Sequence, residues 1–140
     1  MPVDLLLQPV FAMAGWTFVM MVWMYATRLP AMMKLKIHPQ KGQDTRELAQ
    51  LLPKEVSRVA NNYNHLFEQP TVFYVVCIAI VLMEHTDTVH IYCAWIYVML
   101  RVFHSLVQAT IDKVMLRFTL FSLSWLALGV MIMREILSML

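Results

Sequence analysis

The sequence predicts an all-α integral membrane protein, folded as a bundle of four transmembrane helices. Hydrophobic residues make up 60% of the 140 positions and charged residues only 14%, whereas a soluble domain has roughly 45–50% and about 25%. A soluble protein of this size needs more charge to cover its surface. Four stretches of the chain are also long and apolar enough to cross a bilayer, which takes about 20 helical residues.

The four helices are predicted over residues 5–29, 54–85, 88–110 and 115–137, within a single domain of residues 1–140. The first has no charge before Arg28, and Pro9 falls in its first turns, where a missing N–H costs least. The second has a polar half and an apolar half, and only together are they long enough to span. Pro70 lies between these halves and should kink the helix. Because loops two and three are short, consecutive helices should be antiparallel neighbours.

The connector between the first two helices, residues 30–53, holds several prolines and most of the lysines. Asp44 stands three residues before Glu47, which is a weak capping signal for a short helix over residues 46–52. Basic residues gather on this side of the predicted bundle, nine against one on the other side. They are Arg28, Lys34, Lys36, Lys41, Arg46, Lys54, Arg58, Lys113 and Arg117, against Arg134. This bias places the connector in the cytoplasm and both termini on the non-cytoplasmic side.

Two helices carry polar side chains at a spacing of three or four residues, which places them on one face of each helix. These stripes are Arg58, Asn61, His65 and Glu68, flanked by Asn64, on the second helix, and Arg101, His104 and Gln108 on the third. Charged groups within the hydrocarbon normally face the bundle interior or a wet cavity. We therefore expect the stripes to face each other, with Glu68 and Arg101 forming a buried ion pair.

The stripes have two interpretations, and residue types alone do not decide between them. They could be a structural polar network that fixes helix pairing, or a site for a polar or anionic ligand. His38, His85 and His90 share no metal-ligand spacing, so no metal site is predicted. The net charge of only +2 also gives no broad basic surface for nucleic acid.

Three segments carry a resemblance to a known family. Residues 61–70 read Asn-Asn-Tyr-Asn-His-Leu-Phe-Glu-Gln-Pro, residues 100–105 read Leu-Arg-Val-Phe-His-Ser, and residues 116–118 read Leu-Arg-Phe. The chain closely resembles the MAPEG family, the membrane-associated proteins in eicosanoid and glutathione metabolism, and most of all its bacterial branch. The resemblance covers essentially all four helices.

The resemblance implies a homotrimer in a bacterial inner membrane, surrounded by lipid, with glutathione bound between subunits near the cytoplasmic face. It implies that Arg117 is the catalytic residue, since a nearby cation favours the reactive thiolate of glutathione. The residues that it implies for glutathione binding are Asn64, Glu68, His104, Arg101, Arg58 and His65.

The function that follows is a glutathione-dependent transferase or peroxidase acting on apolar electrophiles at the subunit interface. The alternative is a non-catalytic lipid-binding or scaffolding subunit with a structural polar network. This non-catalytic alternative is favoured by several positions at which the chain differs from the catalytic relatives. Aligned on Pro70, their Arg and Glu positions hold Ala60 and Phe67, and Phe118 and Phe121 stand where they often place a Tyr.

Overall fold

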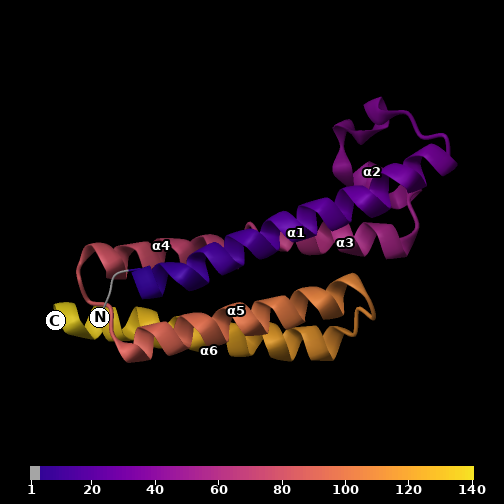
Figure 1. Cartoon of the computed structure of the whole chain (residues 1–140). Coiled ribbons are helices and arrows are strands. Elements are labelled where there is room, and N and C mark those ends of the chain that lie inside the picture. Colours follow the sequence, from indigo (N-terminus) through magenta and orange to yellow (C-terminus); the bar gives the residue numbers. More distant parts are fainter. Residues whose placement is uncertain (1–3) are drawn as a thin grey trace.

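The computed structural model describes residues 4–140 as a bundle of antiparallel helices (Figure 1). Within this range all regular structure is helical, which confirms the predicted fold class. The elements are α1 (Asp4–Lys34), the 3₁₀ turn η1 (Pro39–Gln43), α2 (Thr45–Leu51), α3 (Lys54–His65), α4 (Gln69–Leu82), α5 (Thr88–Ala109) and α6 (Val114–Met139). By length and composition, α1, α5, α6 and the α3–α4 pair could each cross a membrane.

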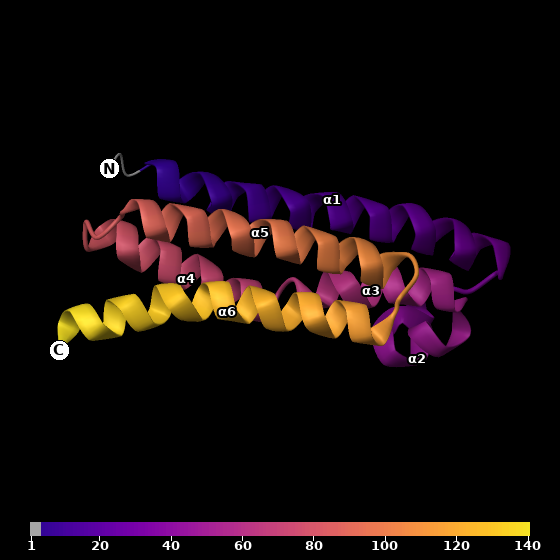
Figure 2. The ribbon, with the colours of Figure 1, turned by 90° about the horizontal axis from the view of Figure 1, so that it is seen from below.

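The two ends of the bundle differ in what they contain (Figure 2). The start of α1, the end of α6 and loop two (residues 83–87) lie together, and we call this the terminal end. The connector and loop three (residues 110–113) lie at the opposite end, which we call the connector end. Segments far apart in the chain therefore meet at each end.

Helix α1 continues five residues past its predicted end and runs through Pro30 to Lys34. Proline removes one helical hydrogen bond but is tolerated in membrane helices where the surroundings compensate. Here the last turn is held by Met32, which is buried against Leu48 and Leu52 of the connector. Tertiary packing thus extends the helix beyond a residue that the sequence alone marks as a stop.

The connector folds into η1 and the short helix α2, as the capping signal predicts. Asp44 is the N-cap of α2, and its carboxylate accepts a hydrogen bond from the Arg46 backbone N–H at 2.9 Å. The cap satisfies one of the backbone donors that a helix start leaves free.

The second span is broken rather than simply kinked. Helix α3 ends at His65, three turn residues follow, and α4 begins at Gln69 with Pro70 in its first turn. In the turn, the N–H groups of Phe67 and Glu68 donate to carbonyls three residues back, at 3.1 and 3.2 Å. These shorter-range bonds replace the α-helical ones that Pro70 and the residues before it cannot make.

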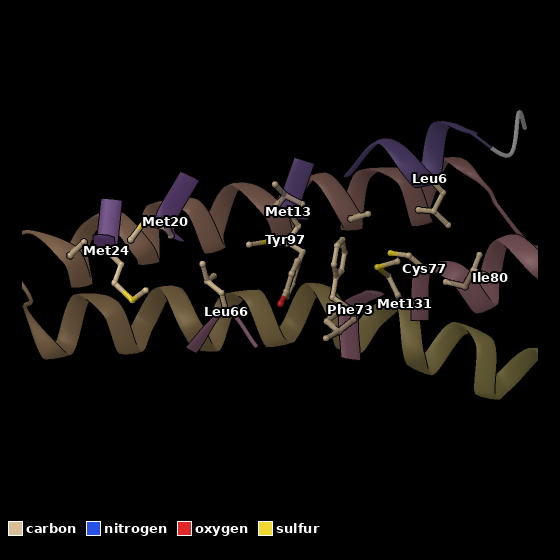
Figure 3. Close-up of a cluster of buried hydrophobic side chains, with 14 of the residues drawn as sticks. Leu6, Met13, Met20, Met24, Leu66, Phe73, Cys77, Ile80, Tyr97 and Met131 are labelled. Carbon is tan, nitrogen blue, oxygen red and sulfur yellow. The ribbon is translucent and has the colours of Figure 1, made fainter. Parts of the chain in front are cut away.

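The core runs along the bundle axis where all four spans meet (Figure 3). Helix α1 contributes Met13, Met20 and Met24, which are nearly or fully buried. Phe73 of α4 stacks on Tyr97 of α5, with ring centroids 4.2 Å apart and planes 14° apart. Such an aromatic pair contributes about 0.5–1.5 kcal/mol beyond the area that it buries, and it fixes α4 against α5 near the middle of the bundle.

The outer surface is as apolar as the core. Phe18, Val75, Ile96 and Leu126, one from each span, are all half exposed or more. Exposed large apolar side chains on every span match a lipid environment.

Candidate functional site

The polar stripe on α5 is buried, as predicted. Arg101, His104 and Gln108 are only 1%, 5% and 2% exposed, and Ser105 beside them is fully buried. Their spacing of three and four residues places the first three on one inward face of α5. A polar face this deeply buried has to be matched by other groups or by a ligand.

A cavity of about 220 Å³ opens at the connector end, between α3, α5 and α6. It is lined by His65, His104, Gln108, Val114, Arg117, Phe118 and Phe121. Three predicted site residues, from three different helices, therefore meet at one place.

His65 connects this cavity to Glu68. The His65 ring lies edge-on to the His104 ring, with centroids 6.5 Å apart. On its other side, His65 Nδ1 lies 3.1 Å from Glu68 Oε2. Glu68 thus contacts His65, which lines the cavity, but Glu68 does not line the cavity itself.

The predicted ion pair between Glu68 and Arg101 is wrong for the described residues. The Glu68 side chain is 68% exposed and contacts His65. Arg101 forms no ion pair anywhere in residues 4–140, and none of its three side-chain nitrogens has a hydrogen-bond partner. The physical reason is the helix break, because Glu68 lies in the turn before α4 and points outward.

Arg101 is instead found over an aromatic ring that lines the cavity. Its guanidinium carbon is 5.7 Å from the centroid of Phe121. A cation–π contact contributes about 0.5–2 kcal/mol, whereas burying an ion costs several kcal/mol. Within the described chain, the charge of Arg101 is therefore undercompensated.

The predicted polar stripe on the second helix is wrong in register. Asn61 and Asn64, like Glu68, are exposed, whereas Asn62 is fully buried and Gln69 is 4% exposed. The buried positions of this span are Val59, Ala60, Asn62, Leu66, Gln69, Pro70, Phe73, Cys77 and Ile80. The apolar residues Val59, Leu66, Phe73, Cys77 and Ile80 could have identified this face, because together with the polar positions 62 and 69 they repeat at three or four.

Arg58 and Gln69 hold different positions on this span. Arg58 is half-buried, and its Nε has no partner among the described residues. Gln69 accepts a hydrogen bond from the Ser124 hydroxyl at 3.2 Å, which joins the start of α4 to α6. Ser124 also donates to the Phe121 carbonyl at 2.6 Å, so this contact lies directly beside the cavity wall.

Arg117 has a partner that sequence reasoning missed. Its Nη1 lies 2.9 Å from Asp112 Oδ1, in loop three, and the contact is an ion pair whose geometry does not make a hydrogen bond. Asp112 has a positive φ of 50°, and this backbone geometry brings a residue outside either helix back toward the first turns of α6. A sequence pattern of helical spacing cannot detect such a contact.

A second polar cluster lies at the terminal end. His85 Nδ1 is 2.7 Å from Glu135 Oε2, and His90 Nε2 is 3.2 Å from Glu135 Oε1. His90 Nδ1 faces the His85 carbonyl oxygen at 3.0 Å. Arg134 pairs with Asp87, which also caps α5 by accepting from the His90 backbone N–H at 2.9 Å. In the part of the chain that the structure describes, no group of three or more such side chains is arranged to hold a metal ion.

The pKa of Asp87 reflects this cluster. Partial burial acts to raise it, but the hydrogen bond from the His90 backbone N–H and the electrostatic contributions of His90 and Arg134 outweigh burial. The pKa of the Asp87 carboxyl is therefore held below its ordinary value.

The two ends of the bundle thus differ in ion pairing: Glu135 and Asp87 have oppositely charged or titratable partners at the terminal end, whereas Arg101 at the connector end has none among the described residues. Comparison with curated proteins and with solved structures found no match. The model of the MAPEG family matches residues 6–137, which is nearly the whole chain. The protein therefore belongs to the MAPEG family of integral membrane proteins.

Proposed function

We propose that the connector-end cavity binds glutathione and that the protein transfers it to, or uses it to reduce, apolar electrophiles. The proposal is carried by one observation: Arg101 is buried without a carboxylate partner, directly behind a cavity that also holds His104 and Arg117. An uncompensated cation of this kind favours an anionic ligand. Membership of a family active in glutathione and eicosanoid metabolism supports glutathione as that ligand.

The polar atoms left without partners fit the chemistry of glutathione. They include all three Arg101 nitrogens, His104 Nδ1 and Gln108 Oε1. Glutathione is an anionic tripeptide with two carboxylates, an ammonium group and a thiol. Guanidinium groups bind carboxylates through strong, charge-assisted hydrogen bonds, and a neutral imidazole or an amide completes such a site.

Each predicted residue has a distinct role in this proposal. His104 and Gln108, which line the cavity, would hold the buried part of the ligand, and Arg101 would supply positive charge from behind Phe121. His65, oriented by Glu68, would form the cavity wall, and the exposed Glu68 carboxylate would attract the ammonium group.

Bound glutathione would supply a thiol nucleophile. Arg117 would provide the positive charge that favours its thiolate form. The half-buried Arg58 and the exposed Asn64 would contribute only at the outer edge of the site, because neither lines the cavity.

The size of the cavity supports a site shared between copies of the chain. Its 220 Å³ falls below the roughly 300–1,000 Å³ of typical small-molecule sites. A tripeptide would extend past His65 toward Asn64 and Glu68, which are exposed on the isolated chain. Polar side chains there are unfavourable against lipid, so a second copy covering them fits a homotrimer.

The apolar substrate would enter from the bilayer. Phe118 lines the cavity and is 60% exposed on the outer surface, with Val114 beside it. These side chains give the cavity an apolar side toward lipid. We place the connector end in the cytoplasm and both termini on the opposite side of a bacterial inner membrane, because nine of the ten basic residues counted above lie on the connector side.

The direct test is glutathione binding to the detergent-solubilised protein, followed by turnover of an apolar electrophile or hydroperoxide. We expect a thermal shift and a saturable binding isotherm at millimolar glutathione. Arg117→Ala should abolish turnover and leave the thermal midpoint of the ligand-free protein within a few degrees. No binding by the wild-type protein would contradict the proposal.

A non-catalytic, lipid-binding role is the second candidate, and the cavity lining favours it in one respect. Among the described lining residues, Phe118 and Phe121 occur where a catalytic relative would offer a tyrosine hydroxyl. In that case the cavity would bind fatty acid or another lipid carboxylate through Arg101. Competition between a fatty acid and glutathione, without any turnover, would support this second role.

A further inference from the structure

Loop three, between α5 and α6, is organised by one residue. The Asp112 backbone N–H donates to the Val107 carbonyl at 2.7 Å and so closes the end of α5. Asp112 adopts a φ of 50°, in the left-handed region. Aspartate and asparagine enter this region more readily than most residues, and glycine enters it freely.

The Asp112 side chain then reaches α6. Its carboxylate lies 2.9 Å from Arg117 Nη1, and the two side chains are 34% and 29% exposed. Arg117 lines the cavity and Asp112 does not. Asp112 is therefore not expected to touch a ligand in the cavity, and Arg117 is the lining residue that it contacts.

A tether of this kind has a clear physical value. A free arginine side chain has several rotatable bonds, and fixing it costs up to about 2 kcal/mol of conformational entropy. Holding one guanidinium nitrogen in advance removes part of this cost from ligand binding. The described pair joins a single nitrogen and a single oxygen, so the other guanidinium nitrogens stay free for a ligand.

We propose that Asp112 is a positioning residue that holds the guanidinium of Arg117 at the cavity, ready for an anionic ligand. This inference rests on the proposed function, because it requires that Arg117 meets glutathione. The competing explanation is purely structural: an acidic residue next to the α6 N-terminus stabilises the helix dipole, and its left-handed backbone shapes the turn.

The backbone geometry permits a clean experiment. Asp112→Asn keeps the size of the side chain and tolerance of a positive φ but removes the charge, and Asp112→Gly keeps the turn without any tether. We expect both variants to bind glutathione about tenfold more weakly, the order found when an orienting partner is lost. Their thermal midpoints without ligand should stay within a few degrees of wild type.

The same substitutions in an Arg117→Ala background separate positioning from structure. If Asp112 acts through Arg117, Asp112→Asn should cause no further loss of affinity there. Asp87→Asn is the matched control, because it removes the equivalent Asp–Arg pair at the other end of the same two helices. It should leave glutathione affinity unchanged.

The outcomes distinguish the two proposals. If wild type binds glutathione and Asp112→Asn binds equally well, positioning is overturned and the proposed function stands. An equal loss of affinity in the wild-type and Arg117→Ala backgrounds, with lower thermal midpoints, would also overturn positioning in favour of a structural role. If wild type does not bind glutathione at all, both proposals fail.

Discussion

Two Asp–Arg pairs bracket the hairpin of α5 and α6, one at each end. At the terminal end, Asp87 precedes α5 and pairs with Arg134 near the end of α6. At the connector end, Asp112 follows α5 and pairs with Arg117 near the start of α6. The pairs join the same two helices. Their surroundings differ, because the neighbouring charged side chains have partners of opposite charge at one end and lack them at the other.

The terminal-end pair belongs to a cluster of several ion pairs and hydrogen bonds. Glu135 contacts both His85 and His90, and Asp87 contacts Arg134 and caps α5. At the connector end, Arg117 lines the cavity, and Arg101 lies behind the Phe121 ring in the wall of the same cavity and has no ion pair in the described chain. Polar groups that satisfy each other hold a fold together, whereas a buried charge without a partner is costly and favours a ligand. On this basis we propose a structural role for the terminal end and ligand binding for the connector end.

The largest expected effect tests Arg101. Arg101→Met removes the undercompensated charge and keeps an apolar side chain, so the ligand-free thermal midpoint should not fall. Glutathione affinity should drop roughly a hundredfold or more, within the range for removing one partner of a buried charged contact. Arg134→Met is the counterpart at the terminal end, and it should lower the midpoint without changing affinity. A marked loss of stability in Arg101→Met would break the comparison.

Glu135→Gln should have the next largest effect. The side chain is only 11% exposed and lies between two imidazoles, so loss of its charge should reduce the free energy of unfolding by about 1–3 kcal/mol. Denaturant or thermal unfolding in detergent would measure this change. Because Glu135 lies at the terminal end, we expect the glutathione affinity of Glu135→Gln to stay within twofold of wild type.

The smallest effect concerns pH at the terminal end. Because the pKa of folded Asp87 lies below its ordinary value, its stabilising contribution is complete above the unfolded pKa, near 3.9. It is lost as the pH falls through the lower, folded value. Below about pH 5, the difference in thermal midpoint between wild type and Asp87→Asn should therefore shrink as the pH falls past about pH 4. A difference that grew on acidification would contradict this sign.

Hydropathy was enough to predict the fold, because lipid imposes long apolar helices and leaves few alternatives. The buried stripe on α5 was predictable for a related reason, since Arg101, His104 and Gln108 lie on one face of an unbroken helix. On the second span the same reasoning was wrong. The prediction placed the inward face along the polar residues that begin at Arg58. The buried side chains of Val59, Leu66 and Phe73 define that face instead, and Asn62 lies on the same face.

The partners of the site residues could not be predicted from spacing. The exposure of Glu68 depends on the turn before Pro70, and the contact of Asp112 with Arg117 depends on a left-handed backbone in loop three. Both are consequences of local backbone geometry outside the helices, where periodicity carries no information.

The break between α3 and α4 gives the second span a mechanical property that an unbroken helix lacks. Three turn residues, Leu66 to Glu68, join the two halves, and Leu66 within this joint is buried in the core. The half before the joint is anchored by Val59 and Ala60 in the same core, and the half after it by Gln69 on Ser124 and by Phe73 on Tyr97. A joint that is held on both sides gives the span a fixed bend, so the helix face that carries His65 is aimed at the cavity independently of the face that α4 presents to the core.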